Sequence, residues 1–344
     1  MRYFWCLFRG EVIRMRWLTI YLVLCVAAWG EELAAVSVLK RFSDVATADT
    51  QRLLVGDIPS ARGGLMDFRN GISAQLCFAV VATPEETARR LQDWDPSRHE
   101  ELKVYAFHIL HNPCSPEDFA ALKLNLKQRP MKWLLDKTQA TTERKSDLNL
   151  TRREARELGG ATSFGDGWAK LLLERAAAFQ RSGIAAAAPY EFGNESVLPA
   201  GQLRAVLAEQ PRIVQEFEPI LKGSGLVGKN ASLTPVEYWS LFEADHHATL
   251  NLGAAYRLAV GDHYQLLDLE YYVSGDYYTS ASLYEIWPVR AGNTTVSLVW
   301  RGDFFAAPVL SFTKGTERIA YGVLMIQEIK KEIRCFQADM KKGQ

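Results

Sequence analysis

The sequence predicts an α+β protein in which a curved antiparallel sheet is closed by a long C-terminal helix and a large, mostly helical insertion interrupts the core. Two observations predict this fold class. Residues 246–302 alternate between apolar and polar side chains, and short turns divide them into four strands. Residues 316–340 carry apolar side chains at three- and four-residue steps, as amphipathic helices do. A long helix across a curved sheet makes a hollow, and hollows lined by apolar side chains bind apolar molecules.

The N-terminal residues 1–30 are expected to be a secretory signal peptide rather than part of the fold. Arg14 and Arg16 precede a short apolar run, and small residues follow it. We therefore expect cleavage after Gly30 and an exported protein, periplasmic or secreted. The alternative is that residues 17–30 act as a membrane anchor, although the apolar run is shorter than the ~20 residues that a comfortable span needs.

An entry segment at 31–71 leads into the first part of the core, residues 72–114. Residues 72–82 are almost wholly apolar and predict a strand. Thr83 follows as the N-cap of a helix, with Pro at the first helical position and Glu at the third. A second strand is expected over 102–110, where an Asn-Pro turn ends it.

Residues 115–243 are predicted to form a helical insertion. Alanine- and leucine-rich stretches alternate there with glycine-rich loops. Ser115 and Thr234 are each followed by Pro and, three residues on, by an acidic residue, which is the pattern of a capped helix start. The insertion is expected to be either a lid or a second layer over the sheet.

Residues 244–344 are expected to complete the core with an antiparallel meander and the C-terminal helix. Short turns join the strands, so neighbouring strands should be antiparallel. The predicted strands are 247–260, 263–273, 278–289 and 294–301.

Two local runs resemble a known fold. FAVVATPEE at 78–86 looks like the first strand of the helix-grip fold entering its first helix, and YQLLDLEYYV at 264–273 resembles one of its wide strands. On these runs the chain resembles the START and Bet v 1-like superfamily over residues 72–111 and 246–340. The resemblance implies a C-terminal helix gripping a concave sheet around a cavity for a lipid or other apolar molecule. Members are often binders or carriers, and some are cyclases or hydrolases, but the matching runs carry over no catalytic residue.

Composition excludes some classes of function. The 344 residues include 40 basic and 40 acidic side chains, so the chain lacks the basic surplus with which proteins neutralise nucleic-acid phosphates. The glycine loops at 159–160 and 165–167 match neither of the glycine-rich phosphate-binding motifs, and the sequence has no G-x-S-x-G and no C-x-x-C. We therefore expect no nucleic-acid partner and no cofactor.

Aromatic and charged side chains concentrate in the predicted meander. The candidate ligand-binding residues are Tyr271, Tyr272, Glu285, Trp287 and Arg301. A carboxylate and a guanidinium among aromatic rings can orient the polar end of an apolar ligand. The alternative is structural, with Glu285 and Arg301 forming a cross-strand ion pair among packed rings.

Strand alternation predicts how these side chains divide between the two faces of the sheet. Tyr272, Glu270 and Asp268 should lie on one face, and Tyr271 with the neighbouring leucines on the other. Both faces therefore carry apolar groups, and both should be covered.

Asp245, His246 and His247 form the densest polar cluster of the chain and are candidates for binding a divalent metal. Adjacent strand residues point to opposite faces, and the chain has no HExxH pair, so we expect no bound metal there. The alternative interpretation is a polar junction between a helix and a strand.

The sequence thus predicts an exported protein that binds or carries a lipid-like or other apolar small molecule without transforming it. Two alternatives stay open: a hydrolase or cyclase that uses the His246/His247 region, and a structural envelope protein without a ligand. Contact with a membrane surface is left open as a further interaction, and so is the oligomeric state.

Overall fold

The structure is a computed structural model, and it describes residues 35–45, 49–122, 128–143, 145–161, 163–228, 231–291 and 294–342. The predicted signal peptide at 1–30, and with it the alternative anchor at 17–30, lies outside these residues. Among the described helices, none is long and apolar enough to cross a membrane.

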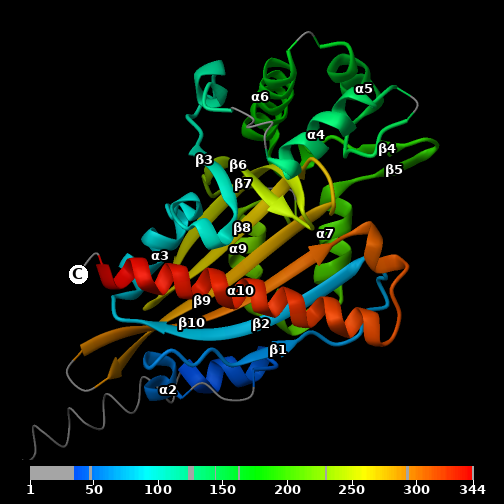
Figure 1. The fold of residues 1–344 in the computed structure, drawn as a ribbon. Coiled ribbons are helices and arrows are strands. Elements are labelled where there is room, and N and C mark those ends of the chain that lie inside the picture. The colour runs from blue at the N-terminus through cyan, green and yellow to red at the C-terminus, as the bar shows by residue number, and fades with distance from the viewer. Residues whose placement is uncertain are drawn as a thin grey trace, which may run out of the picture.

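An eight-stranded antiparallel sheet forms the centre of the fold, in the order β1-β2-β10-β9-β8-β7-β6-β3 (Figure 1). Its strands are β1 (Ser60–Arg62), β2 (Gly71–Val80), β3 (Val104–Ile109), β6 (Val236–Ala244), β7 (His247–Val260), β8 (His263–Val273), β9 (Thr279–Ala291) and β10 (Thr294–Ala306). The strands β2 and β3, far apart in sequence from the meander, join its two ends. A small hairpin pairs β4 (Tyr190–Phe192) with β5 (Glu195–Val197).

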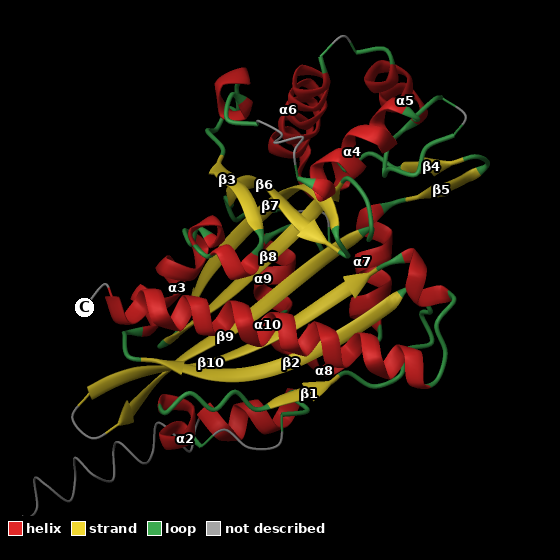
Figure 2. Cartoon of the chain, in the orientation of Figure 1, coloured by secondary structure: helices red, strands yellow, loops and turns green. Residues whose placement is uncertain are grey.

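Helices cover both faces of this sheet (Figure 2). A helix covers residues 35–42. The others are α2 (Thr50–Leu54), α3 (Pro84–Gln92), α4 (Arg129–Gln139), α5 (Arg152–Gly159), α6 (Phe164–Ser182), α7 (Pro199–Ala208), α8 (Pro211–Glu216), α9 (Glu218–Gly223) and α10 (Thr316–Lys342). Single 3-10 turns occur at η1 (Pro96–Arg98), η2 (Glu100–Leu102), η3 (Pro116–Phe119), η4 (Gly183–Ala186) and η5 (Pro308–Ser311). Helices α3 and α10 lie on one face, α7 and α9 lie on the other, and α4 to α6 gather beyond one end of the strands (Figure 1). The α+β class, with a large antiparallel sheet and a long C-terminal helix, is confirmed.

One predicted helix start is confirmed in detail, and a second is confirmed only as a local cap. The Thr83 hydroxyl accepts the backbone N–H of Glu86 at 3.3 Å, so one of the unpaired amides at the start of α3 is satisfied. At Ser115 the capping box forms with Asp118 as its acidic partner, but it opens only the short 3-10 turn η3.

The helix start predicted at Thr234 is wrong, because Val236–Ala244 is strand β6. The residues that follow the cap pattern are β-branched and aromatic, which favours a strand, and β6 is paired on both sides by β3 and β7. Segment 115–243 therefore contains the β4–β5 hairpin and most of β6 as well as helices, and the meander has one more strand than the sequence predicted.

Alternation gives the sheet two cores. Trp239 and Trp300 are fully buried on the face toward α4–α9. Phe78, Ile286 and Phe336 are buried on the face toward α3 and α10. Each fully buried side chain of this size contributes about 1.5–3 kcal/mol to folding. The second face also carries the polar groups that define the candidate site.

Candidate functional site

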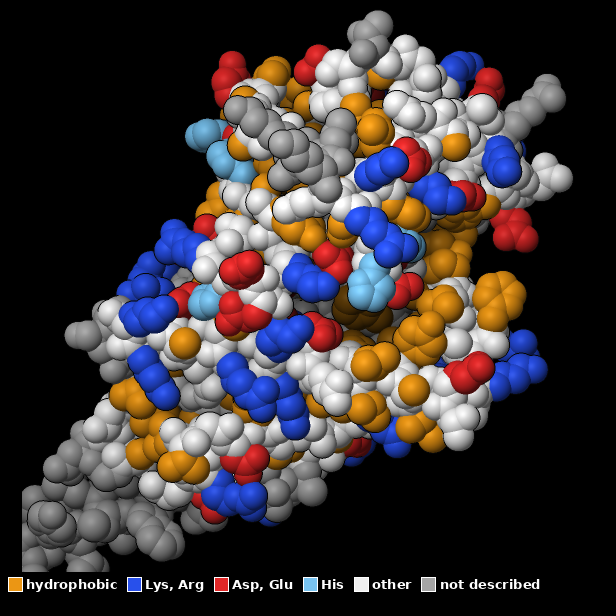
Figure 3. Space-filling view, in the orientation of Figure 1, with side chains coloured by type: hydrophobic (Ala, Val, Ile, Leu, Met, Phe, Trp, Pro, Cys, Tyr) orange, Lys and Arg blue, Asp and Glu red, His pale blue; other side chains and the backbone are white. Residues whose placement is uncertain are grey.

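Helix α10 covers its face of the sheet unevenly. In its second half, Ile329, Ile333, Phe336 and Met340 are buried against the sheet and α3. Figure 3 shows a recess on this side of the molecule, between α10 and the turn that joins β6 to β7. Hydrophobic atoms form the base of the recess, and acidic, basic and histidine side chains lie at its rim.

An acidic cluster lies on this face, beside and beneath α10. It consists of Asp268 and Glu270 of β8, Asp303 of β10 and Glu332 of α10, with Arg301 of β10 as its cation. The Arg301 guanidinium lies 2.8 Å from Asp303 and 3.0 Å from Glu332, so it ties α10 to the sheet. With Arg301 shared between those two acids, Asp268 and Glu270 have no cation in contact among the described residues.

Tyrosine hydroxyls hold these two carboxyls in place. Tyr238 donates to Asp268 at 2.8 Å, and Tyr277 donates to Glu270 at 2.6 Å. The ring of Tyr238 lies directly over Gly253 of β7, where a Cβ atom would stand 2.1 Å from the ring. Glycine at this position is therefore required for Tyr238 to reach Asp268.

Burial makes Asp268 a weak acid. Its pKa is raised to about 7, chiefly by desolvation and also by the negative charges of Glu270 and Glu332, while the hydrogen bond from Tyr238 and the charge of Arg301 act in the opposite direction. Burial likewise raises the pKa of Glu270, against hydrogen bonds from Ser280, Tyr277 and Asn251. Both side chains nevertheless keep part of their surface exposed. Desolvated acids that a solute can still reach are typical of functional sites.

Aromatic rings flank the two acids. Phe107 of β3 packs on Tyr238 with ring centroids 5.2 Å apart, and Phe305 of β10 packs on Tyr277 at 4.9 Å. Phe107 and Phe305 are only partly buried. The surface therefore offers hydrogen-bond acceptors and negative charge at its centre and apolar area at its edges, which suits an amphipathic molecule.

The predicted ligand residues Tyr271 and Tyr272 both contact the helical segment instead of α10. Tyr271 stacks on Phe179 of α6 with centroids 3.8 Å apart, and its hydroxyl donates to Glu237. The guanidinium of Arg175, also on α6, lies 4.2 Å from the Tyr272 ring.

The prediction that Tyr272 shares a face with Asp268 and Glu270 is wrong. A β-bulge causes the difference: Leu252 of β7 pairs with Tyr272, but the next residue, Gly253, pairs with Glu270. The extra residue in β8 interrupts the alternation, so two consecutive tyrosines reach the same side.

The alternative of an ion pair between Glu285 and Arg301 is also wrong. Glu285 lies opposite Trp300, and Arg301 lies opposite Tyr284, so the two charges point to opposite faces of the sheet. Glu285 lies 2.8 Å from Nε2 of His263.

Trp287 is buried on the same face as Glu285, near Phe42. Of the five predicted ligand residues, only Arg301 lies in the acidic cluster. The structure does not bring the five together.

The candidate metal ligands Asp245, His246 and His247 do not converge either. Asp245 and His246 form the β6–β7 turn with positive φ angles of 44° and 67°. The exposed His246 side chain lies 3.4 Å from Glu243, whereas His247 stacks on Trp133 with centroids 3.9 Å apart. The polar junction predicted there joins two strands rather than a helix and a strand.

A surface depression of about 260 Å³ between α5 and α6 does not compete with this site. Three of its charged side chains are paired with one another: Lys170 lies 3.2 Å from Glu157 and 3.8 Å from Glu174. Charges satisfied at an exposed rim leave little with which to recognise a ligand.

Comparison with known proteins does not identify the chain: no protein-family model matches it, and no curated protein is similar to it in sequence. The geometry of the described residues therefore carries the functional proposal.

Replacing Asp268 by Asn is expected to stabilise the protein at alkaline pH. The pKa of Asp268 is higher in the folded state than its ordinary value of 3.8, so its favourable contribution is present at low pH and is lost as pH rises from about 4 through about 7. Asn cannot ionise, and the variant should exceed the wild type by about 4 kcal/mol at pH 8 and match it near pH 4.

Urea unfolding from pH 4 to pH 8 measures this difference. Glu237, whose pKa burial raises to about 7, titrates in the same range and stays in both proteins as background. Asp67→Asn, at an exposed position before β2, is the matched control and should follow the wild type. Identical pH profiles for Asp268→Asn and the wild type would show that Asp268 is not desolvated.

Proposed function

We propose that this protein binds a small amphipathic molecule, without transforming it, on the sheet face beside α10. The polar end of the ligand carries a positive charge or several hydrogen-bond donors and faces Asp268 and Glu270. Its apolar part lies against the partly exposed rings of Phe107 and Phe305. The observation that carries the proposal is the pair of desolvated carboxyls, Asp268 and Glu270, that each keep part of their surface exposed on the face of the sheet that α10 crosses.

The order of elements supports this assignment. A strand leads into a helix, antiparallel strands follow, and a long final helix lies across the sheet. That is the arrangement which the helix-grip resemblance implies, and in that arrangement the ligand lies between the sheet and the last helix. The long segment between β3 and β6 forms a layer of its own, which includes α7 and α9 on the opposite face. Export remains part of the proposal on the pattern of residues 1–30 alone.

Contact with a membrane surface stays a prediction, and one feature favours it. Large apolar side chains are exposed on η5 and on the first half of α10, on the α10 side of the molecule (Figure 3). They are Val309, Phe312, Ile319, Tyr321, Val323 and Leu324.

The ligand test begins with organic extraction and mass spectrometry of the purified full chain. In a titration with fluorescent amphiphiles of equal chain length, a cationic head group should bind more tightly than a carboxylate head group, and more tightly as pH rises through about 7. The double variant Asp268→Asn/Glu270→Gln should weaken cationic binding about 10- to 100-fold, the usual value of hydrogen bonds to charged groups.

Glu328→Gln is the matched control, since Glu328 is an exposed acid of α10 that pairs with Lys331. It should bind as the wild type does. Equal binding of both head groups, or full binding by the double variant, would show that the acidic cluster is not part of the ligand site.

An enzyme is the second candidate, and the same two acids favour it. A carboxyl with a pKa of about 7 beside a second carboxyl can act as a general acid near neutral pH. Extraction separates the two candidates, because a binder returns the added ligand chemically unchanged and a hydrolase returns products.

A further inference from the structure

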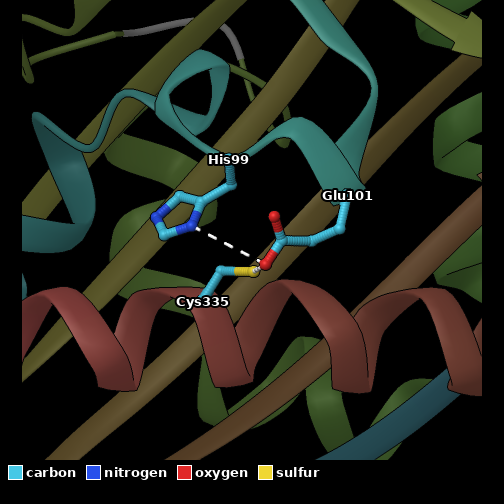
Figure 4. Close-up of side chains that lie close together, drawn as sticks. All are labelled: His99, Glu101 and Cys335. Atoms are coloured by element: carbon cyan, nitrogen blue, oxygen red, sulfur yellow. Dashed lines mark hydrogen bonds and ion pairs between the residues drawn. The ribbon is translucent and has the colours of Figure 1, made fainter.

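The 3-10 turns that follow α3 meet the last turns of α10, and this contact brings three metal-ligating side chains together. His99 lies between η1 and η2, Glu101 lies in η2, and Cys335 lies on α10. One ligand atom from each lies within 4.8 Å of the other two. Figure 4 shows the three side chains pointing toward one another across the gap between the turn and the helix.

The distances fit a zinc ion with small adjustments. Cys335 Sγ lies 3.3 Å from Glu101 Oε1, and His99 Nδ1 lies 4.0 Å from the same oxygen. Tetrahedral zinc with ordinary bond lengths of about 2.0–2.3 Å requires ligand separations of about 3.4–3.6 Å. The third separation, between the ligand atoms of His99 and Cys335, is at most 4.8 Å, so it must shorten by up to about 1 Å for all three atoms to reach bonding distance.

The histidine is oriented for this role by an independent contact. His99 Nε2 lies 2.7 Å from Oδ2 of Asp339, which also accepts the indole N–H of Trp94 at 3.0 Å. Asp339 follows Cys335 by one helical turn, so both face the same 3-10 turns. A carboxylate on one ring nitrogen fixes the tautomer and presents the other nitrogen, Nδ1, to an ion, as in carboxylate–histidine–zinc arrangements.

Access and charge are also suitable. Glu101 is exposed, which gives an ion a path from solvent, whereas Cys335 is buried beneath it. Burial and the neighbouring Glu101 charge raise the pKa of the Cys335 thiol, so the sulfur binds an ion only by releasing its proton to solvent. The hydrogen bonds of Glu101 lower the pKa of its own carboxyl, which is therefore ionised.

We propose that His99, Glu101 and Cys335 bind one Zn²⁺ ion, which clamps the end of α10 to the turn that follows α3. A thiolate, an imidazole and a carboxylate form a donor set that zinc accepts and that magnesium and calcium avoid. Asp339 is a positioning residue, and water completes the coordination. This proposal is independent of the ligand site, because it concerns a different contact of α10.

Calorimetry of the full chain with ZnCl₂, after chelator dialysis, tests the clamp. The wild type should bind one equivalent, release about one proton per ion and unfold at a higher temperature with zinc. Cobalt(II) should give a thiolate-to-cobalt charge-transfer band.

Glu101→Gln changes an exposed side chain that folding does not need, and it should abolish the single tight site, as should Cys335→Ser. Asp339→Asn should weaken the site about 10- to 100-fold, the usual effect of losing such a partner. Glu100→Gln and Cys114→Ser are matched controls and should bind as the wild type does. If Glu101→Gln and Cys335→Ser retain wild-type zinc affinity, or if the wild type shows no charge-transfer band, the proposal is overturned.

Discussion

Replacing Arg175 by Leu is expected to lower the free energy of unfolding by about 3–5 kcal/mol, the usual effect of removing one partner of a buried ion pair. Arg175 of α6 and Glu154 of α5 lie 2.7 Å apart with only 5% and 7% of their side chains exposed. The guanidinium also lies over the rings of Tyr272 and Tyr190, at 4.2 and 5.6 Å. The variant leaves the Glu154 carboxylate buried without its cation and removes the contact of α6 with the Tyr272 ring of β8.

Urea unfolding measures the loss, and Arg153→Leu is the matched control. Arg153 pairs with Glu174 at 2.8 Å, but both side chains are exposed, so the control should change stability by less than about 0.5 kcal/mol. Adding Glu154→Leu to Arg175→Leu should recover much of the loss, because the unpaired charge is gone. Equal effects of Arg175→Leu and Arg153→Leu would mean that the buried pair contributes nothing to the attachment of the helical segment.

Local sequence patterns predict some elements of this fold correctly and fail at others. The cap at Thr83 and the apolar stripe of α10 depend on residues a few positions apart. The cap is confirmed, and the stripe is buried in the second half of α10, whereas Ile319 and Val323 in its first half are exposed. The start predicted at Thr234 depended on an equally local pattern, but β3 and β7 supply the pairing that makes this segment a strand. Local propensity cannot anticipate partners that lie more than a hundred residues away.

The candidate site was less predictable than the fold. Alternation correctly placed Asp268 and Glu270 on one face, because both precede the bulge in β8, which lies opposite Gly253 of β7. It did not single them out, since burial by α10 and a tyrosine hydroxyl from β6 gives them their properties. His99 and Cys335 are 236 residues apart along the sequence, and no local pattern links them.

Replacing Phe336 by Ala is expected to cost about 3–4 kcal/mol, the loss usual for a buried aromatic ring. Phe336 is 2% exposed and packs edge-on against Phe78 of β2 and Trp94, with ring centroids 6.5 and 5.7 Å apart. It is the point at which α10, the sheet and the turn after α3 meet. Leu324→Ala, on the exposed first half of the same helix, should change stability by less than about 0.5 kcal/mol.

Phe336→Ala also tests whether α10 is held by a zinc ion as well as by apolar packing. If α10 is held only by apolar contacts, zinc should restore none of the lost stability. If Zn²⁺ bridges His99, Glu101 and Cys335, the ion binds the folded state alone, and the variant should regain about 2.7 kcal/mol at a zinc concentration a hundred times the dissociation constant. Thermal unfolding of Phe336→Ala and Phe336→Ala/Glu101→Gln with and without zinc measures this, because only the first variant should respond. The second half of α10 then owes its position to apolar packing on the sheet, to the ion pair of Glu332 with Arg301 and to the polar contact on the turn, while Asp268 and Glu270 stay partly exposed to a ligand.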